Sequence, residues 1–106
     1  MPKYLVQANY VGDGVKGLLK EGGSSRRAVV EKLIKSVGGT LETFYYAFGE
    51  TDLFIIADIP DNASCAAATL MAAASGVINV KTTVLMTPED LDNAAKKTPI
   101  YRPPEK

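Results

Sequence analysis

The sequence predicts an α+β domain in which one four-stranded antiparallel sheet is covered by helices on a single face. Three observations support this class. Four segments rich in β-branched and aromatic residues, 3–11, 40–48, 52–59 and 78–86, are typical of strands. A helical segment separates the first strand from the second and the third from the fourth, whereas a short turn joins the middle two. The length of 106 residues is that of one domain, residues 1–106.

The first half reads as a strand, a short helix, a longer helix and a second strand. Gly12-Asp13-Gly14 ends the first strand, and the helical spacing of the apolar residues that follow predicts one or two turns before Gly22-Gly23. Ser24 or Ser25 is the expected N-cap of the longer helix. Its apolar stripe consists of Val29, Val30, Leu33, Ile34 and Val37.

The second half begins with a hairpin, because only a short turn separates segments 40–48 and 52–59. Pro60-Asp61-Asn62 is expected to cap an alanine-rich helix over 62–75. After the fourth strand, Thr87-Pro88-Glu89-Asp90 has the cap, proline and acidic residues that open a helix. An extended tail follows over 99–104. The resulting order, βαββαβ with an added C-terminal helix, is the ferredoxin-like arrangement.

Strand alternation separates two faces of the sheet. The rows Tyr4, Val6, Ala8, Tyr10 and Leu53, Ile55, Ala57, Ile59 are the more apolar and are expected beneath the helices. The opposite, open face would then carry Leu5, Gln7, Phe54, Ile56 and Asp58, together with Phe44 or Tyr46. So large an apolar patch is typical of an interface. We therefore expect a homodimer, or a higher oligomer, that forms sheet to sheet.

Composition excludes several functional classes. Lys and Arg number 12, as do Asp and Glu, so the chain lacks the positive charge of a general nucleic-acid or anionic-membrane binder. The absence of His and the single Cys exclude histidine-ligated metals, disulfide frameworks and Ser-His or Cys-His nucleophiles. No acidic cluster has metal-ligand spacing, so no metal or cofactor is expected. With no signal peptide and an unpaired cysteine, we expect a cytoplasmic location.

Four residues are candidates for binding a small molecule: Asn9, Tyr10, Tyr46 and Asp52. The tyrosines could orient a ligand by hydrogen bonds and ring contacts, or could simply pack on an amphipathic strand. Asp52 could belong to a ligand loop, or could cap the turn that begins at Gly49. The expected pocket lies between the sheet and the glycine-rich first helix, or at the dimer seam.

Residues 44–52, Phe-Tyr-Tyr-Ala-Phe-Gly-Glu-Thr-Asp, resemble the signature of the GYD-domain family. Segments 59–62, 87–89 and 101–104 also fall where that family has a strand end, a helix start and a closing tail. Gly49 and Asp52 match the family pattern, whereas Thr51 stands where Tyr is usual. The resemblance implies a dimeric α+β barrel, an architecture shared by cofactor-independent monooxygenases, haem-dependent enzymes and small-molecule sensors.

Three functions follow as hypotheses. The first is a homodimer that binds a small organic molecule. The second, suggested by the resemblance, is an enzyme similar to the cofactor-independent monooxygenases. The third is a purely structural oligomerisation module, in which the tail over 101–104 contributes to assembly.

Overall fold

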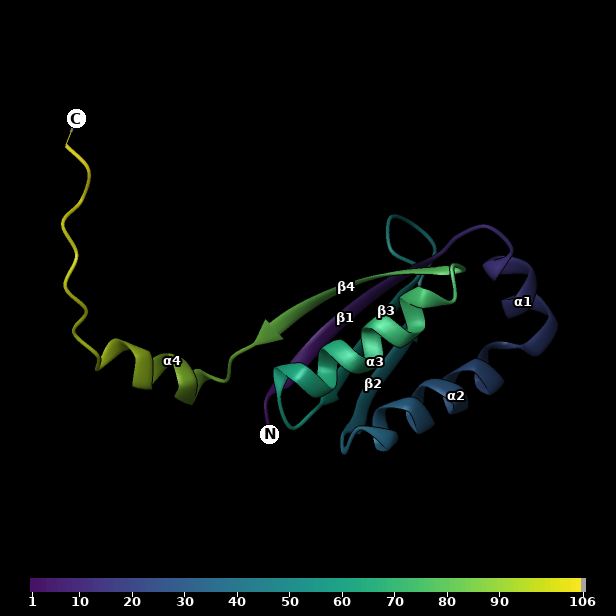
Figure 1. Cartoon of the computed structure of the whole chain (residues 1–106), viewed down its shortest axis with the longest axis horizontal. Helices are drawn as coiled ribbons and strands as arrows, with labels where there is room; N and C mark the ends of the chain where they lie inside the picture. Colours follow the sequence, from purple (N-terminus) through teal and green to yellow (C-terminus); the bar gives the residue numbers. More distant parts are fainter. Residues whose placement is uncertain (106) are drawn as a thin grey trace.

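The computed structural model describes residues 1–105 and confirms the α+β class and the predicted order of elements (Figure 1). The first half contains β1 (Lys3–Tyr10), α1 (Gly14–Glu21), α2 (Gly23–Ser36) and β2 (Thr40–Tyr46). The second half contains β3 (Leu53–Asp58), α3 (Asn62–Ala74), β4 (Ile78–Leu85) and α4 (Pro88–Ala95). Every strand begins and ends within two residues of its predicted limits.

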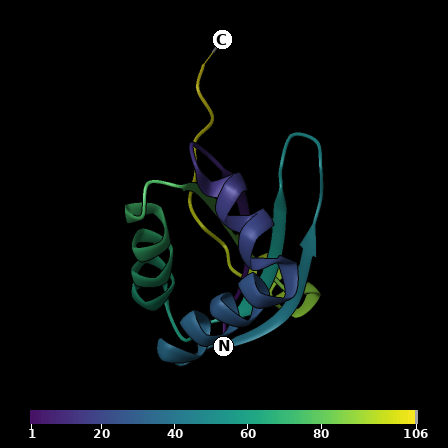
Figure 2. The ribbon, with the colours of Figure 1, turned by 90° about the vertical axis from the view of Figure 1, so that its right-hand side faces the viewer.

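The four strands form one antiparallel sheet in the order β2-β3-β1-β4, as the ferredoxin-like arrangement requires. Helices α2 and α3 lie on the same face (Figure 2), where the core is formed. Its best-buried large side chains are Tyr4, Leu53 and Ile59. Ile34 of α2 and Cys65 of α3 complete the core on the helix side of the sheet. The alternation predicted for β1 and β3 is confirmed.

A bulge in β2 decides which of its aromatic residues face the helices. The pairing with β3 shifts between Leu41 and Thr43, so that Glu42 is an extra residue in the strand. Beyond the bulge, Phe44 and Tyr46 lie on the helix-covered face. Their rings contact edge to face at 5.2 Å between centroids.

The prediction that Phe44 or Tyr46 belongs to the open face is therefore wrong. Tyr45 takes that place instead, opposite Phe54 of β3. The physical reason is the extra residue, because one insertion exchanges the faces of every side chain that follows it.

The start of α2 also differs from the prediction. The helix begins at Gly23, and its N-cap is Gly22, which offers no side-chain hydrogen bond. Gly22 has φ +88°, a left-handed conformation that glycine adopts without strain. This conformation turns the chain directly from α1 into α2, before Ser24 and Ser25 are reached. The serine cap is therefore wrong, whereas the Asp61 cap of α3 is confirmed by its bond from Ser64 N at 2.8 Å.

The end of the chain leaves the body of the domain. Every residue from Met86 to Glu105 is exposed, and α4 stands apart from the sheet and the other helices (Figure 1). The radius of gyration is 17.0 Å. A compact chain of this length would have about 13 Å. We call residues 86–105 the C-terminal arm.

Candidate functional site

Asn9 and Asp52 lie together where β1 meets the loop between β2 and β3. The Asp52 backbone N–H donates to Asn9 Oδ1 at 2.8 Å and also to the Ala8 carbonyl at 3.1 Å. In return, Asp52 Oδ2 accepts from the Tyr10 backbone N–H at 3.0 Å. These bonds fasten the loop to β1, so the Asp52 side chain bonds to a neighbouring strand and not to the turn that begins at Gly49.

Tyr10 and Tyr46 lie on the helix-covered face, against two glycines. Tyr46 Oη donates to the Gly23 carbonyl at 2.9 Å, and a Cβ on Gly23 would lie 3.0 Å from the Tyr46 ring. At Gly14, a Cβ would lie 3.2 Å from the Tyr10 ring. The glycine-rich segment is thus required where the helices approach the tyrosines closely.

The Tyr46 phenol is held in its neutral form. Burial, and then the neighbouring Tyr10, raise the pKa of Tyr46 to about 12, and a smaller opposing effect comes from Arg26. At neutral pH, the phenol is therefore a hydrogen-bond donor, and that donor is occupied by Gly23.

The structure does not bring the four candidates into one pocket. Tyr46 lines a shallow hollow with Leu18, Leu19, Gly22 and Gly23, which is the predicted position between the sheet and the first helix. Asn9 lines a separate polar hollow on the other side, with Gln7, Ala8, Thr51, Asn79, Val80 and Lys81. The binding roles of Asn9, Tyr10, Tyr46 and Asp52 stay predictions.

An apolar groove lies between α2, α3 and the sheet. The sequence predicted a pocket between the sheet and the helices, but not the residues that line this one. This apolar groove encloses about 70 Å³ and is partly open to solvent. Its walls come from both helices and three strands. They are formed by Val30, Leu33 and Ile34 of α2, by Ala68, Thr69 and Ala72 of α3, and by Val6, Ala8, Leu53, Ile55, Ala57, Ile59, Ile78 and Val80 from the sheet side.

Helix α3 leaves space in the groove because it turns its small residues inward. Ala68 is buried and Ala72 is half-buried, and both line the groove. The large apolar residues of the helix, Leu70 and Met71, are 68% and 70% exposed. A helix that only closed a core would place such residues against the sheet. This inverted pattern is the signal in the sequence that could have located the groove.

Helix α3 carries a hydroxyl at Thr69 and a thiol at Cys65. The hydroxyl is hydrogen-bonded within the helix, and the thiol is protonated. Thr69 is the one polar residue of the groove wall, and its Oγ1 bonds to the carbonyls of Cys65 and Ala66 at 3.1 and 3.2 Å. Burial raises the pKa of the Cys65 thiol, so the sulfur is protonated at neutral pH. This agrees with the role of Cys65 as a small buried residue of the core.

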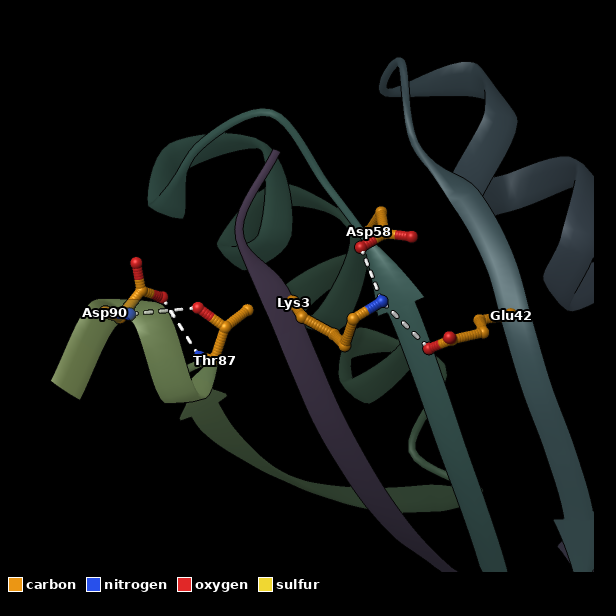
Figure 3. A network of polar contacts seen from close by, with 5 residues as sticks. All are labelled: Lys3, Glu42, Asp58, Thr87 and Asp90. Atoms are coloured by element: carbon orange, nitrogen blue, oxygen red, sulfur yellow. Dashed lines mark hydrogen bonds and ion pairs between the residues drawn. The ribbon is translucent and has the colours of Figure 1, made fainter. Parts of the chain in front are cut away.

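The open face carries a charged cluster at one end. Lys3 Nζ donates to Asp58 Oδ1 and to Glu42 Oε2, both at 2.9 Å (Figure 3). The bond to Asp58, followed by the bond to Glu42, raises the pKa of Lys3. One lysine of β1 thus joins carboxylates from β3 and β2 across the sheet. Asp58, which the sequence placed on the open face, therefore has a charged partner within its own sheet.

The five residues predicted for the dimer face share one face of the sheet. Leu5 lies opposite Ile56, Gln7 lies opposite Phe54, and Asp58 lies opposite Lys3. All of them are partly exposed in the single chain. Strand β4, whose register the sequence left open, adds Lys81, Thr83 and Leu85 to this face, and β2 adds Thr43 and Tyr45.

A metal-binding cluster and a membrane-spanning helix are both absent from residues 1–105. Residues 1–105 contain no group of three His, Cys, Asp or Glu side chains placed to hold a metal ion. In the same range, no helix combines the length and the apolar character needed to cross a membrane.

Comparison with known proteins supplies the family. Neither the curated proteins nor the solved structures include a significant match to the chain. A family model, described as GYD domain, matches residues 4–95. This range includes the four strands, the groove, the Asn9–Asp52 contact and α4. The chain therefore belongs to the GYD-domain family.

Proposed function

We propose that this protein is a homodimer that binds a small, neutral, apolar molecule in the groove between α2, α3 and the sheet. The observation that carries the proposal is the inverted pattern of α3, with alanine lining the groove and leucine and methionine in solvent. Small-molecule sites are typically concave, mostly apolar and about 300–1,000 Å³ in volume. The enclosed part of the groove, about 70 Å³, is smaller than this, so only a small compound that extends toward the open side of the groove would fit.

The chemistry of the wall selects the class of ligand. Thirteen of its fourteen residues are apolar, and the hydroxyl of the remaining Thr69 is bonded to its own helix. A charged or strongly polar ligand would lose its hydration there without gaining partners. An uncharged aromatic or short alkyl compound has no strong hydration to lose on entering the groove. The groove is preferred to the hollow beside Tyr46 because the donor of that phenol is already bonded to Gly23.

The dimer in this proposal forms through the open face of the sheet. Leu5, Phe54 and Ile56 occupy adjacent positions on the two central strands, and no helix covers them. A second sheet would remove this apolar surface from water, at a gain of roughly 25 cal/mol per Å². The substitution Phe54→Glu should therefore dissociate the dimer into monomers, which sedimentation analysis would detect. Leu70→Glu, on the exposed side of α3, is the matched control and should leave the dimer intact.

Ligand binding is tested by filling the groove. The probe is N-phenyl-1-naphthylamine, an uncharged aromatic dye whose fluorescence rises in apolar sites. Ala72→Leu places a larger side chain on the wall and should weaken dye binding at least tenfold. Ala73→Leu makes the same change on an exposed position of the same helix and should have little effect. Equal binding by both variants would refute the groove as the site. Thermal unfolding of each variant verifies that the fold is kept.

A further inference from the structure

The C-terminal arm contains a helix that has no packing surface within residues 1–105. All of its residues in the described range are exposed, and α4 makes no extended contact with another helix or strand of residues 1–105. Leu91, the large apolar residue of α4, is 58% exposed. The helix thus presents an apolar side chain to water rather than to a core.

This helix is too short to be stable by itself. It has eight residues, whereas isolated helices below about 12–15 residues are marginal in water. Its capping box is complete, since Asp90 N donates to Thr87 Oγ1 and Thr87 N donates to Asp90 Oδ2, at 3.0 and 3.1 Å (Figure 3). Such a cap contributes about 1 kcal/mol. The remaining stabilisation has to come from a surface outside the chain.

The chemistry of α4 describes that surface. Leu91 shares one side of the helix with Ala94 and Ala95, and the segment contains three acidic residues and no basic one. A matching surface has an exposed apolar residue flanked by positive charges. Leu19 of α1 is 79% exposed at the open rim of the hollow beside Tyr46, and Lys16 and Lys20, which precede and follow it in the helix, are also exposed. Helix α3 has exposed apolar residues but no charged residue, so it has no positive charge that could pair with the acidic residues of α4.

The α1 helix of the same chain is out of reach. The arm leaves β4 at Leu85, which lies opposite Lys3 at the start of β1, whereas α1 follows the far end of β1. Eight residues of strand separate these ends by about 27 Å. Only Met86 and Thr87 connect β4 to α4, and two extended residues span about 7 Å. The acceptor is therefore on another molecule.

We propose that α4 docks on the exposed surface of α1 of a second copy of this chain, with Leu91 against Leu19 and the acidic residues of α4 beside Lys16 and Lys20. The arrangement rests on the sheet-to-sheet dimer of the proposed function. A twofold axis across the strands brings the arm of one chain to the α1 end of the other, and the exchange is reciprocal. The arm also continues from β4, which contributes Lys81, Thr83 and Leu85 to the open face.

The first test compares Leu91→Lys with Asn93→Lys in the full chain. Both variants add one positive charge to an exposed position of α4, but only the first removes the apolar contact. Neither touches the body of the domain, so folding is preserved. Sedimentation equilibrium should give a dimer Kd at least tenfold weaker for Leu91→Lys, and a Kd within threefold of the original for Asn93→Lys. Equal Kd values for the original protein and Leu91→Lys would overturn the proposal.

Hydrogen exchange supplies an independent readout. The amides of α4 should be protected in the original dimer and unprotected in Leu91→Lys. Exchange at unstructured rates in the original dimer, or equal protection in the monomer at high dilution, would overturn the exchange of arms. To identify the acceptor, Lys20→Glu should weaken the dimer and Lys35→Glu, on α2, should not. Equal effects of the two reversals would overturn α1 as the docking surface.

The same experiments distinguish the proposed sheet interface from the proposed docking of the arm. If Phe54→Glu separates the dimer but Leu91→Lys leaves its Kd unchanged, the sheet interface stands and the arm is refuted. If Leu91→Lys weakens a dimer that Phe54→Glu leaves intact, the sheet interface fails, and with it the geometry on which the proposed arm exchange rests. The dye experiment on Ala72→Leu depends on neither result.

Discussion

Replacing Asp52 by alanine tests whether this residue is a structural clamp. Asp52 Oδ2 is the acceptor for the Tyr10 backbone N–H at 3.0 Å, in a partly buried position. Without it, the N–H is left unpaired at a cost of about 1–3 kcal/mol in the free energy of unfolding. At about 2 kcal/mol, the melting temperature should fall by roughly 8–16 °C. Equilibrium urea unfolding followed by circular dichroism measures the free energy directly.

Two companion variants make the reasoning specific. Asp52→Asn retains an acceptor oxygen for Tyr10 N and should lose less than the alanine variant, because only the charge assistance of the bond is removed. Asn9→Ala removes Oδ1, but the Asp52 N–H keeps its second acceptor, the Ala8 carbonyl, at 3.1 Å. Its cost should therefore stay below about 1 kcal/mol. A loss under about 0.5 kcal/mol for Asp52→Ala, or a larger loss for Asn9→Ala, would refute the clamp.

Two further predictions concern Tyr46 and the glycines of α1. The Tyr46 phenol has a pKa raised to about 12, so the unfolded chain ionises first as pH rises, and stability is lost between about pH 10 and 12. Urea unfolding across this pH range should show a smaller loss in the free energy of unfolding for Tyr46→Phe than for the original protein. If the stability of both proteins falls by the same amount, the raised pKa of Tyr46 is contradicted. Gly14→Ala places a Cβ 2.2 Å from the Val77 carbonyl and should cost at least about 2 kcal/mol. Gly17→Ala, a helical position where a Cβ meets nothing within 4 Å, should instead stabilise the domain by about 0.5–1 kcal/mol, and similar melting temperatures for both variants would contradict the packing argument.

Central strands were easier to predict than the edge strand β2. Alternation in β1 and β3 is uninterrupted, so counting from Tyr4 or Leu53 assigns every side chain to the correct face. In β2, the bulge allows both Leu41 and Phe44 to face the helices although they are three positions apart. It also leaves Glu42 able to reach Lys3, which lies far away in the sequence. Such tertiary contacts decide where a bulge forms, and local propensity carries no record of them.

The candidate site was only partly predictable for a related reason. Sequence reasoning selects residues with chemical groups, and it singled out Asn9, Tyr46 and Asp52 as candidates for ligand binding. It did not predict the contacts that the structure shows between Asn9 and the Asp52 N–H and between Tyr46 and the Gly23 carbonyl. The apolar groove has no distinctive group. It results from missing volume at Ala68 and Ala72 and from the separation of α2 and α3, which is fixed only when the whole fold assembles.

The inverted pattern of α3 bears on the volume of the groove. The best-buried large side chains, Tyr4, Leu53 and Ile59, belong to β1, β3 and the segment just after β3. Helix α3 adds only small residues to this core, and among its alanines that line the groove Ala72 is half-buried whereas Ala68 is buried. A larger residue at Ala72 fills open space rather than displacing packed atoms. A change of residue at position 72 therefore alters the groove volume without displacing the sheet, and in the proposed function this position would limit the size of the bound molecule.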